Sequence, residues 1–151
     1  MNTQPLAPAV PAAMPSQDDR LLAAFAHLSF LTGFWLIAPI AIYFLKRKES
    51  RFVAFQALQA VFVQLFWCVM MTCSVFVVTV LTMGASLSSH HELSPLFALL
   101  PTLGMLGGGL GLLGLHGLAA YRAWCGRDWS IPVAGGMARA VQAADEGAVR
   151  A

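Results

Sequence analysis

The sequence predicts an all-α integral membrane protein, a three-span transmembrane helical bundle with an amphipathic interfacial lead-in to the second span. Of its 151 residues, 58% are hydrophobic and 11% are charged, which is far too apolar for an ordinary soluble domain. The charges are also segregated, because Asp, Glu, Lys and Arg are absent from residues 21–45, 52–91 and 93–121. Each stretch exceeds the roughly 20 residues with which a helix crosses a hydrocarbon core of about 30 Å.

Composition divides the chain into a tail, a membrane domain and a second tail. The first tail is rich in Pro and Ala, and we expect it to be disordered. Near its end, Ser16 and Asp19 have the spacing of a capping box that starts a helix. No cleaved targeting segment is expected, because the first basic residue is Arg20 and the following apolar stretch is too long. The three parts are residues 1–20, residues 21–129 with spans at about 21–45, 61–83 and 96–121, and residues 130–151.

The first two spans carry features beyond their apolar length. Gly33 and Pro39 interrupt the first, and the missing N–H and bulky ring of proline predict a kinked helix. Residues 52–83 are too long for one perpendicular span. We therefore expect the first two turns to lie on the membrane surface, with Phe52 and Phe55 entering the acyl boundary. The basic turn that precedes them is expected to contact lipid phosphates through Lys46, Arg47, Lys48 and Arg51.

The third span is rich in glycine. At about 100° per residue, five of its glycines fall on one arc of the helix, and small-residue stripes let helix backbones approach closely in lipid. Two interpretations stay open: a seam inside the bundle, or a seam between copies in a homo-oligomer. The helix-packing residues are Gly104, Gly107, Gly108, Gly111 and Gly114.

Three polar side chains are expected within the membrane: His27, Gln64 and His116. Because three spans would place the two histidines near opposite faces, about 20 Å apart in depth, we expect no direct pair. By depth, His27 could bond Thr79 or Thr102, and His116 could bond Gln64. These side chains either form structural hydrogen bonds between helices or serve a proton- or substrate-linked role.

Catalytic, cofactor-binding and metal-binding residues are not expected. No phosphate-binding loop, nucleophile elbow or zinc-protease motif occurs in the sequence, so an enzyme is not predicted. The neighbouring His90, His91 and Glu92 are interpreted as a solvated loop, because a metal site needs further donors at fixed spacing. The cysteines, which we interpret as packing residues, are Cys68, Cys73 and Cys125.

Three spans would place the two termini on opposite sides of the membrane. Putting the basic turn and the C-terminal arginines in the cytoplasm leaves only Arg20 outside. The positive-inside rule therefore predicts a multi-pass protein of the bacterial inner membrane, with its N-terminus outside and its C-terminus in the cytoplasm. The expected partners are the lipid bilayer and either further copies or other membrane-protein subunits, and not nucleic acid.

A family resemblance is sharpest in the eleven residues from Ser50 to Ala60, and it includes Tyr121, Gly126, Trp129 and Pro132 after the last span. They resemble the family of the twenty-kilodalton subunit of the chloroplast inner-envelope (Tic) protein-import translocon and its small bacterial relatives. The resemblance implies a helical bundle that contributes to a protein-conducting channel, without catalytic residues. The plant subunit has four spans and a transit peptide, neither of which is expected here, which favours a bacterial relative. The motif residues are Arg51, Phe52, Phe55, Gln56, Ala57, Gln59 and Ala60.

Two functions follow as expectations. The first is a non-enzymatic translocon-like or scaffold subunit that acts through helix packing. The alternative is a small-solute or proton-linked transport or channel component that uses His27, Gln64 and His116. Three helices enclose no pore by themselves, so a channel would require oligomerisation.

Overall fold

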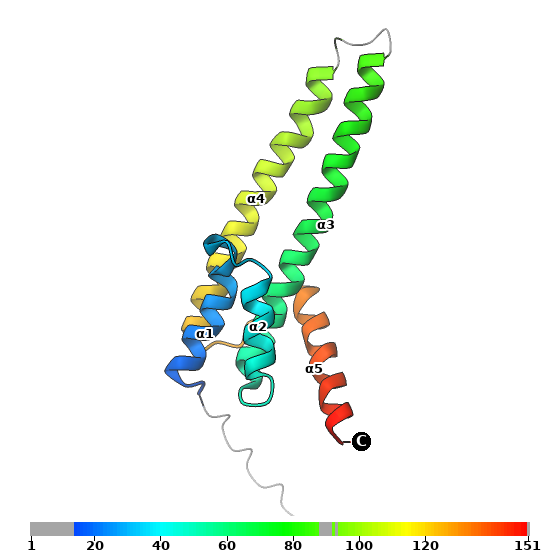
Figure 1. Cartoon of the computed structure of the whole chain (residues 1–151). Coiled ribbons are helices and arrows are strands. Elements are labelled where there is room, and N and C mark those ends of the chain that lie inside the picture. Colours follow the sequence, from blue (N-terminus) through cyan, green and yellow to red (C-terminus); the bar gives the residue numbers. More distant parts are fainter. Residues whose placement is uncertain (1–13, 88–91, 93, 151) are drawn as a thin grey trace, which may run out of the picture.

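The computed structural model describes residues 14–87, 92 and 94–150, and every element within these ranges is a helix. Two long helices stand side by side, and the other helices pack around their lower ends (Figure 1). We call this lower part the base and the free upper part of the two long helices the arm. The all-α prediction is thereby confirmed. The elements are α1 (Gln17–Leu28), the 3-10 helix η1 (Ser29–Thr32), α2 (Ile37–Lys46), α3 (Arg51–Leu87), α4 (Ser94–Trp124) and α5 (Ala134–Arg150).

The long helices α3 and α4 are the two candidate membrane spans of the described chain. They contain 37 and 31 residues, which corresponds to about 55 and 46 Å at 1.5 Å per residue. Along the arm their large apolar side chains face outward, as at Phe66, Phe76 and Leu106, which are 66%, 68% and 63% exposed. Such a surface suits lipid rather than water. A third span is not confirmed.

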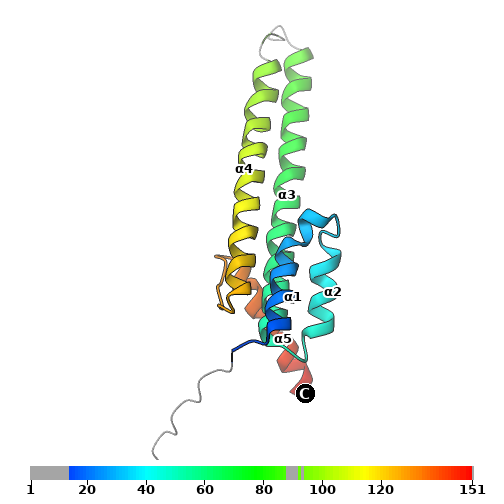
Figure 2. The same cartoon turned by 90° about the vertical axis from the view of Figure 1, so that its left-hand side faces the viewer.

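Residues 21–45, predicted as one kinked span, instead form a short helical hairpin. The chain rises through α1, reverses after η1 and descends through α2 (Figure 2). Gly33 makes the reversal with a left-handed φ of 80°, a conformation that costs glycine little. Ser29 Oγ donates to the Ala26 carbonyl at 2.9 Å, which satisfies a carbonyl at the helix end. Pro39 lies in the first turn of α2, where its missing N–H breaks no helical bond.

The first turns of α3 are not an interfacial lead-in but the centre of the base. Val53, Ala57 and Ala60 are 0% exposed, and α3 contacts α1, α2, α4 and α5. The reason is that the hairpin and α5 close around these turns and remove them from lipid. Small side chains permit this close approach, and the fully or almost fully buried ones are Ala23, Ala26, Ala54, Ala57, Ala60, Ala119, Ala123 and Ala138.

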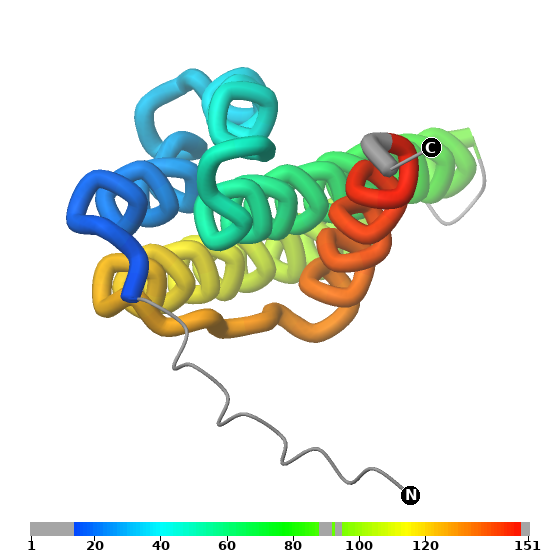
Figure 3. Tube along the Cα trace, turned by 90° about the horizontal axis from the view of Figure 1, so that it is seen from below, coloured from blue at the N-terminus to red at the C-terminus, as the bar shows by residue number. Residues whose placement is uncertain are grey.

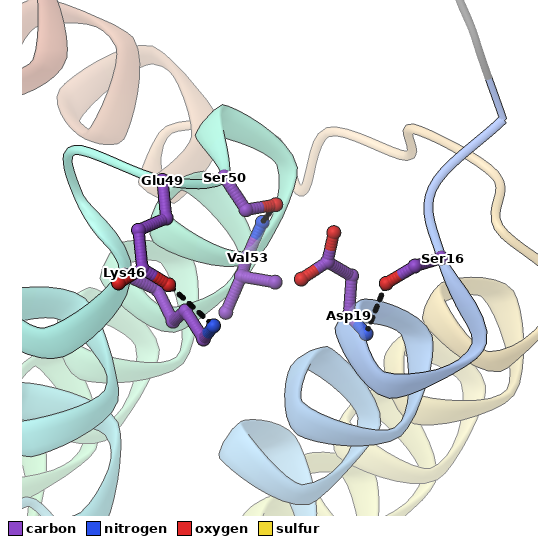
Figure 4. Close-up of polar contacts among 6 residues, drawn as sticks. All are labelled: Ser16, Asp19, Lys46, Glu49, Ser50 and Val53. Atoms are coloured by element: carbon purple, nitrogen blue, oxygen red, sulfur yellow. Dashed lines mark hydrogen bonds and ion pairs between the residues drawn. The ribbon is translucent and has the colours of Figure 1, made fainter.

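Local polar contacts begin the helices of the base (Figure 4). Ser16 Oγ accepts a hydrogen bond from the Asp19 N–H at 3.1 Å, so the predicted cap of α1 is confirmed. Ser50 Oγ accepts from the Val53 N–H at 3.4 Å and caps α3 in the same way. These side chains satisfy amide groups that the first turn of a helix leaves without partners.

The basic turn is partly neutralised by its own chain. The predicted C-terminal tail contains α5, which packs beside α3 (Figure 3). Arg47 Nη1 lies 3.1 Å from Asp145 Oδ1, and Arg51 Nη2 lies 2.8 Å from Glu146 Oε1. The predicted lipid contacts of these two arginines therefore compete with carboxylates of α5. The other two predicted headgroup ligands are Lys46, which pairs with Glu49 at 2.6 Å, and Lys48, for which no ion pair is found among the described residues.

Candidate functional site

The base encloses a cluster of five long polar side chains, which we call the polar cluster. It contains His27 from α1, Gln56, Gln59 and Gln64 from α3, and His116 from α4. All five are at most 2% exposed. Burying a polar group away from water is costly unless it is hydrogen-bonded. The polar cluster is therefore the candidate site.

His27 is the best-connected histidine of the polar cluster. Its Nε2 lies 3.1 Å from Gln56 Oε1, so Nε2 carries the proton and donates, which leaves Nδ1 as an acceptor in the neutral ring. Burial lowers the pKa of His27 to about 4, against the opposing effect of the Gln56 hydrogen bond, and the neighbouring His116 lowers it further. His27 is consequently neutral at pH 7.

The two histidines lie next to each other, so the prediction that they are about 20 Å apart was wrong. Their ring centroids are 5.7 Å apart, and the Phe30 ring lies 4.8 Å from that of His116. The error came from treating residues 21–45 as a full span, whereas α1 packs beside the lower part of α4 within the base. Thr79 and Thr102, the predicted partners of His27, bond carbonyls of their own helices instead.

Four members of the polar cluster have polar atoms without a hydrogen-bond partner in the described part of the chain. These atoms are His27 Nδ1, Gln56 Nε2, both polar atoms of Gln64 and both ring nitrogens of His116. The predicted bond between His116 and Gln64 is therefore not formed. Buried groups of this kind are rare in proteins and call for an explanation. They could exchange hydrogen bonds with a water molecule, a proton carrier or a small polar solute.

Gln59 differs from the rest of the polar cluster because both ends of its amide are bonded. Nε2 donates to the Trp129 carbonyl at 3.1 Å, and Oε1 accepts from the Ile131 N–H at 2.6 Å. Gln59 thereby ties the segment between α4 and α5 to α3. A Cβ at Gly135 would collide with Ser130 Oγ and lie 3.2 Å from Gln59 Oε1, so this connection requires glycine there.

Sequence reasoning gave Gln56 and Gln59 no role of their own in a site. Both belong to the stretch assigned to the membrane surface, where their amides would be solvated. The available signal was their spacing of three residues, which places both on one helical face. Ala57 and Ala60, which each follow one of these glutamines and are fully buried, indicate that this part of the helix is packed rather than exposed.

The predicted glycine face is mostly open within one chain. A Cβ added at Gly104, Gly107, Gly111 or Gly114 would meet nothing within 4 Å. At Gly108 an added Cβ would lie 2.9 Å from the Trp67 ring. Within the described chain, a close internal seam is therefore formed at Gly108, and the rest of this face is free to pack against another molecule.

Comparison with known proteins corrects the expected family. A model of the MamF/MmsF family, described as the magnetosome magnetite crystal formation protein family, matches residues 18–138. No curated protein and no solved structure matches the chain. The match includes the whole stretch from Ser50 to Ala60 on which the resemblance to the Tic subunit rested, so that assignment was wrong. Apart from the exposed Arg51 and the half-buried Phe52, the motif residues instead form the buried turns of α3 that carry Gln56 and Gln59.

The structure and the match agree on the class of protein. The two long helices are apolar enough to cross a membrane, and the matched residues include the hairpin, both long helices and the first turn of α5. The described residues that carry the polar cluster all lie inside the match. The chain belongs to the MamF/MmsF family of magnetosome membrane proteins.

Proposed function

We propose that this protein is a non-enzymatic subunit of the magnetosome membrane that takes part in magnetite crystal formation by assembling with further copies through its arm. The family description supports the cellular role. The observation that carries the assembly is the open glycine face of α4, where Gly104, Gly107 and Gly114 have no neighbour within 4 Å of an added Cβ. Helices in lipid associate by close packing of such small residues.

The charge distribution supports one orientation in the membrane. All nine Lys and Arg residues lie outside residues 52–121. With two spans, α3 and α4, every one of these charges lies on the base side. The positive-inside rule then places the base and both termini in the cytoplasm. The earlier expectation of an outside N-terminus loses its premise, because it depended on a third span.

The thickness of the bilayer fits this placement. From Leu65 to Leu87, α3 is lined by exposed apolar side chains, and this stretch rises about 33 Å. A hydrocarbon core is about 30 Å thick. The arm would thus fill the bilayer, and the tip of the hairpin, with Phe34 and Trp35 exposed, would lie at the cytoplasmic headgroup level.

Substitution on the glycine face tests the assembly. The double variant Gly104→Leu and Gly107→Leu is expected to abolish cross-linking between copies in membranes and to alter magnetite crystal size in a magnetite-forming bacterium that lacks the native gene. Gly84→Leu is the matched control, because this glycine of α3 also has open space around it. Unchanged cross-linking and unchanged crystals in the double variant would exclude the proposal.

A second candidate function, proton-linked or small-solute transport, is favoured by the unpartnered atoms of the polar cluster. Gln64 and His116 carry four of these buried atoms. Purified protein in vesicles is then expected to carry a flux of protons or of a small polar solute, and His116→Phe is expected to remove it, whereas Phe30→Leu is not. Vesicles that show no flux above protein-free controls would rule this function out.

A further inference from the structure

An apolar groove lies beside the polar cluster, on the outside of the two long helices. It has a volume of about 630 Å³ and is lined only by apolar residues, a size typical of sites for small molecules. One wall is α3 between Phe62 and Val69, the second is α4 between Gly108 and Leu115, and the third runs from Ile131 to Met137. The groove is distinct from the polar cluster, because none of the polar cluster's five residues lines it.

The third wall of the groove is held in place by the fold. Gln59 bonds the backbone at Trp129 and Ile131, and the segment passes α4 and α3 on the side away from α2 (Figure 3). Val133 has a left-handed φ of 67°, which is unfavourable for a β-branched residue. Its side chain is 79% exposed. This exposed side chain lines the groove.

The groove lies at the depth where lipid chains meet their headgroups. On α3 it begins at Phe62 and ends at Val69, a rise of about 10 Å. The exposed apolar surface of the arm begins at Leu65. The groove therefore spans the boundary between the base and the hydrocarbon region. Like the proposed function, this depth depends on the placement of α3 and α4 in a bilayer.

Positive charge is available at the base end of the groove. Trp129 packs against groove residues that include Ile131, and the Arg122 guanidinium lies 5.7 Å from the Trp129 ring centroid. Arg122 follows the groove residue Leu115 by two helical turns. Unlike Arg47 and Arg51, it forms no ion pair with any described residue. Its charge is complementary to a phosphate.

We propose that this groove is a binding site for an anionic phospholipid, with one acyl chain between α3, α4 and residues 131–137 and the phosphate at Arg122. An acyl chain is the occupant that the observations favour, because the walls are apolar and an empty space would forfeit dispersion contacts. A helix of a second copy is about 10–12 Å wide with its side chains, and to enter the groove it would have to fit between α3, α4 and the third wall.

Photo-cross-linking of the full chain in vesicles tests this site. The probe is phosphatidylglycerol with a diazirine in one acyl chain, compared with phosphatidylcholine carrying the same chain, and labelled peptides are identified by mass spectrometry. Phosphatidylglycerol is expected to label residues 62–69, 108–115 and 131–137 at least fivefold more than the rest of the arm. Arg122→Gln is expected to reduce this labelling to the level seen with phosphatidylcholine.

Two glycines of α4 provide a matched pair of variants. Gly111 lines the groove and Gly114 does not, and an added Cβ at either meets nothing within 4 Å. Gly111→Phe is expected to fill the groove and lower its labelling at least fivefold, whereas Gly114→Phe leaves it unchanged. Met137→Trp narrows the groove from the opposite wall and serves as a second variant if Gly111→Phe does not fold.

Three results would overturn the proposal. Uniform labelling along the arm, unchanged in Gly111→Phe and Met137→Trp, would mean that only bulk lipid touches these surfaces. Protein-to-protein cross-links that replace lipid labels within the groove would assign it to a second copy. Equal labelling by the two lipids, unaffected by Arg122→Gln, would overturn the proposal that the site selects an anionic headgroup. Gly104 and Gly107 do not line the groove, so loss of assembly in the variant Gly104→Leu and Gly107→Leu with lipid labelling retained distinguishes failure of one proposal from failure of the other.

Discussion

Replacing Gln59 with Leu is expected to destabilise the base, whereas the same replacement at Gln64 is not. Both glutamines are 0% exposed on the same helix. Gln59 accepts from the Ile131 N–H and donates to the Trp129 carbonyl, whereas neither polar atom of Gln64 has a partner in the described chain. The comparison therefore isolates the hydrogen bonds from the size and burial of the side chain.

The magnitude follows from what each substitution leaves behind. Gln59→Leu leaves the N–H of Ile131, a residue only 5% exposed, without its acceptor, and a buried unsatisfied group costs about 1–3 kcal/mol. With the loss at Trp129, we expect a decrease of about 2–4 kcal/mol in the free energy of unfolding. That is a fall of roughly 4–16 °C in Tm for a chain of this size. Gln64→Leu removes two unsatisfied atoms and is expected to be neutral or stabilising.

Thermal and denaturant unfolding in detergent micelles, followed by circular dichroism, measures both variants under the same conditions. The expected order of Tm is Gln64→Leu at or above the unsubstituted protein, with Gln59→Leu clearly below both. An equal loss of stability in the two variants would refute the reasoning. That outcome would show that Gln64 is hydrogen-bonded in the native state.

Three further predictions concern the membrane arrangement, the buried histidine and the segment between α4 and α5. In a background without native cysteines, Cys introduced at Glu92 is expected to react with an impermeant thiol reagent in intact cells and Cys at Gln17 is not; reaction at both positions would restore the three-span arrangement. Because the pKa of His27 is lowered to about 4 from 6.5, the unfolded state binds its proton first as pH falls. Stability is therefore complete above pH 6.5 and declines toward pH 4, by up to about 1.4 kcal/mol per pH unit. Unfolding titrations in detergent should show this decline, and His27→Phe should reduce its slope without removing it, because the buried His116 remains; an identical pH profile in that variant would contradict the assignment. Gly135→Ala is expected to cost about 1–3 kcal/mol through its clash with a serine hydroxyl. Gly136→Ala, where an added Cβ meets nothing within 4 Å, should gain up to about 1 kcal/mol from helix propensity, and equal effects on Tm would argue against the packing described.

Long apolar stretches predicted α3 and α4 well, because uninterrupted apolar sequence of that length has few other stable forms in a bilayer. The same reasoning failed for residues 21–45. Hydropathy measures how apolar a stretch is and not whether the chain reverses within it. The reversal depends on the left-handed conformation of Gly33 and on the Ser29 hydroxyl bonding the Ala26 carbonyl, which are local effects that a sum over residues does not contain.

The polar cluster could be predicted only in part. His27, Gln64 and His116 were singled out because polar side chains are rare in apolar helices, and the structure buries all three in one region. Their partners could not be derived, since depth was counted from an assumed third span. Gln56 and Gln59 were assigned to the membrane surface because residues 52–83 are too long for one perpendicular span, and the packing of α5 over that helix was not readable from its weakly apolar sequence.

Helix α3 is continuous from Arg51 to Leu87 and belongs to both the base and the arm. The same rod forms the core of the base and half of the arm, so neither part can rotate without the other. Membrane helices change tilt with the thickness of the bilayer, over a range of about 0–40°. A change of about 10° displaces one end of a rod about 55 Å long by about 10 Å relative to the other. A change in bilayer thickness that tilts the arm would therefore also change the angle at which the base and its charged turn meet the cytoplasmic surface.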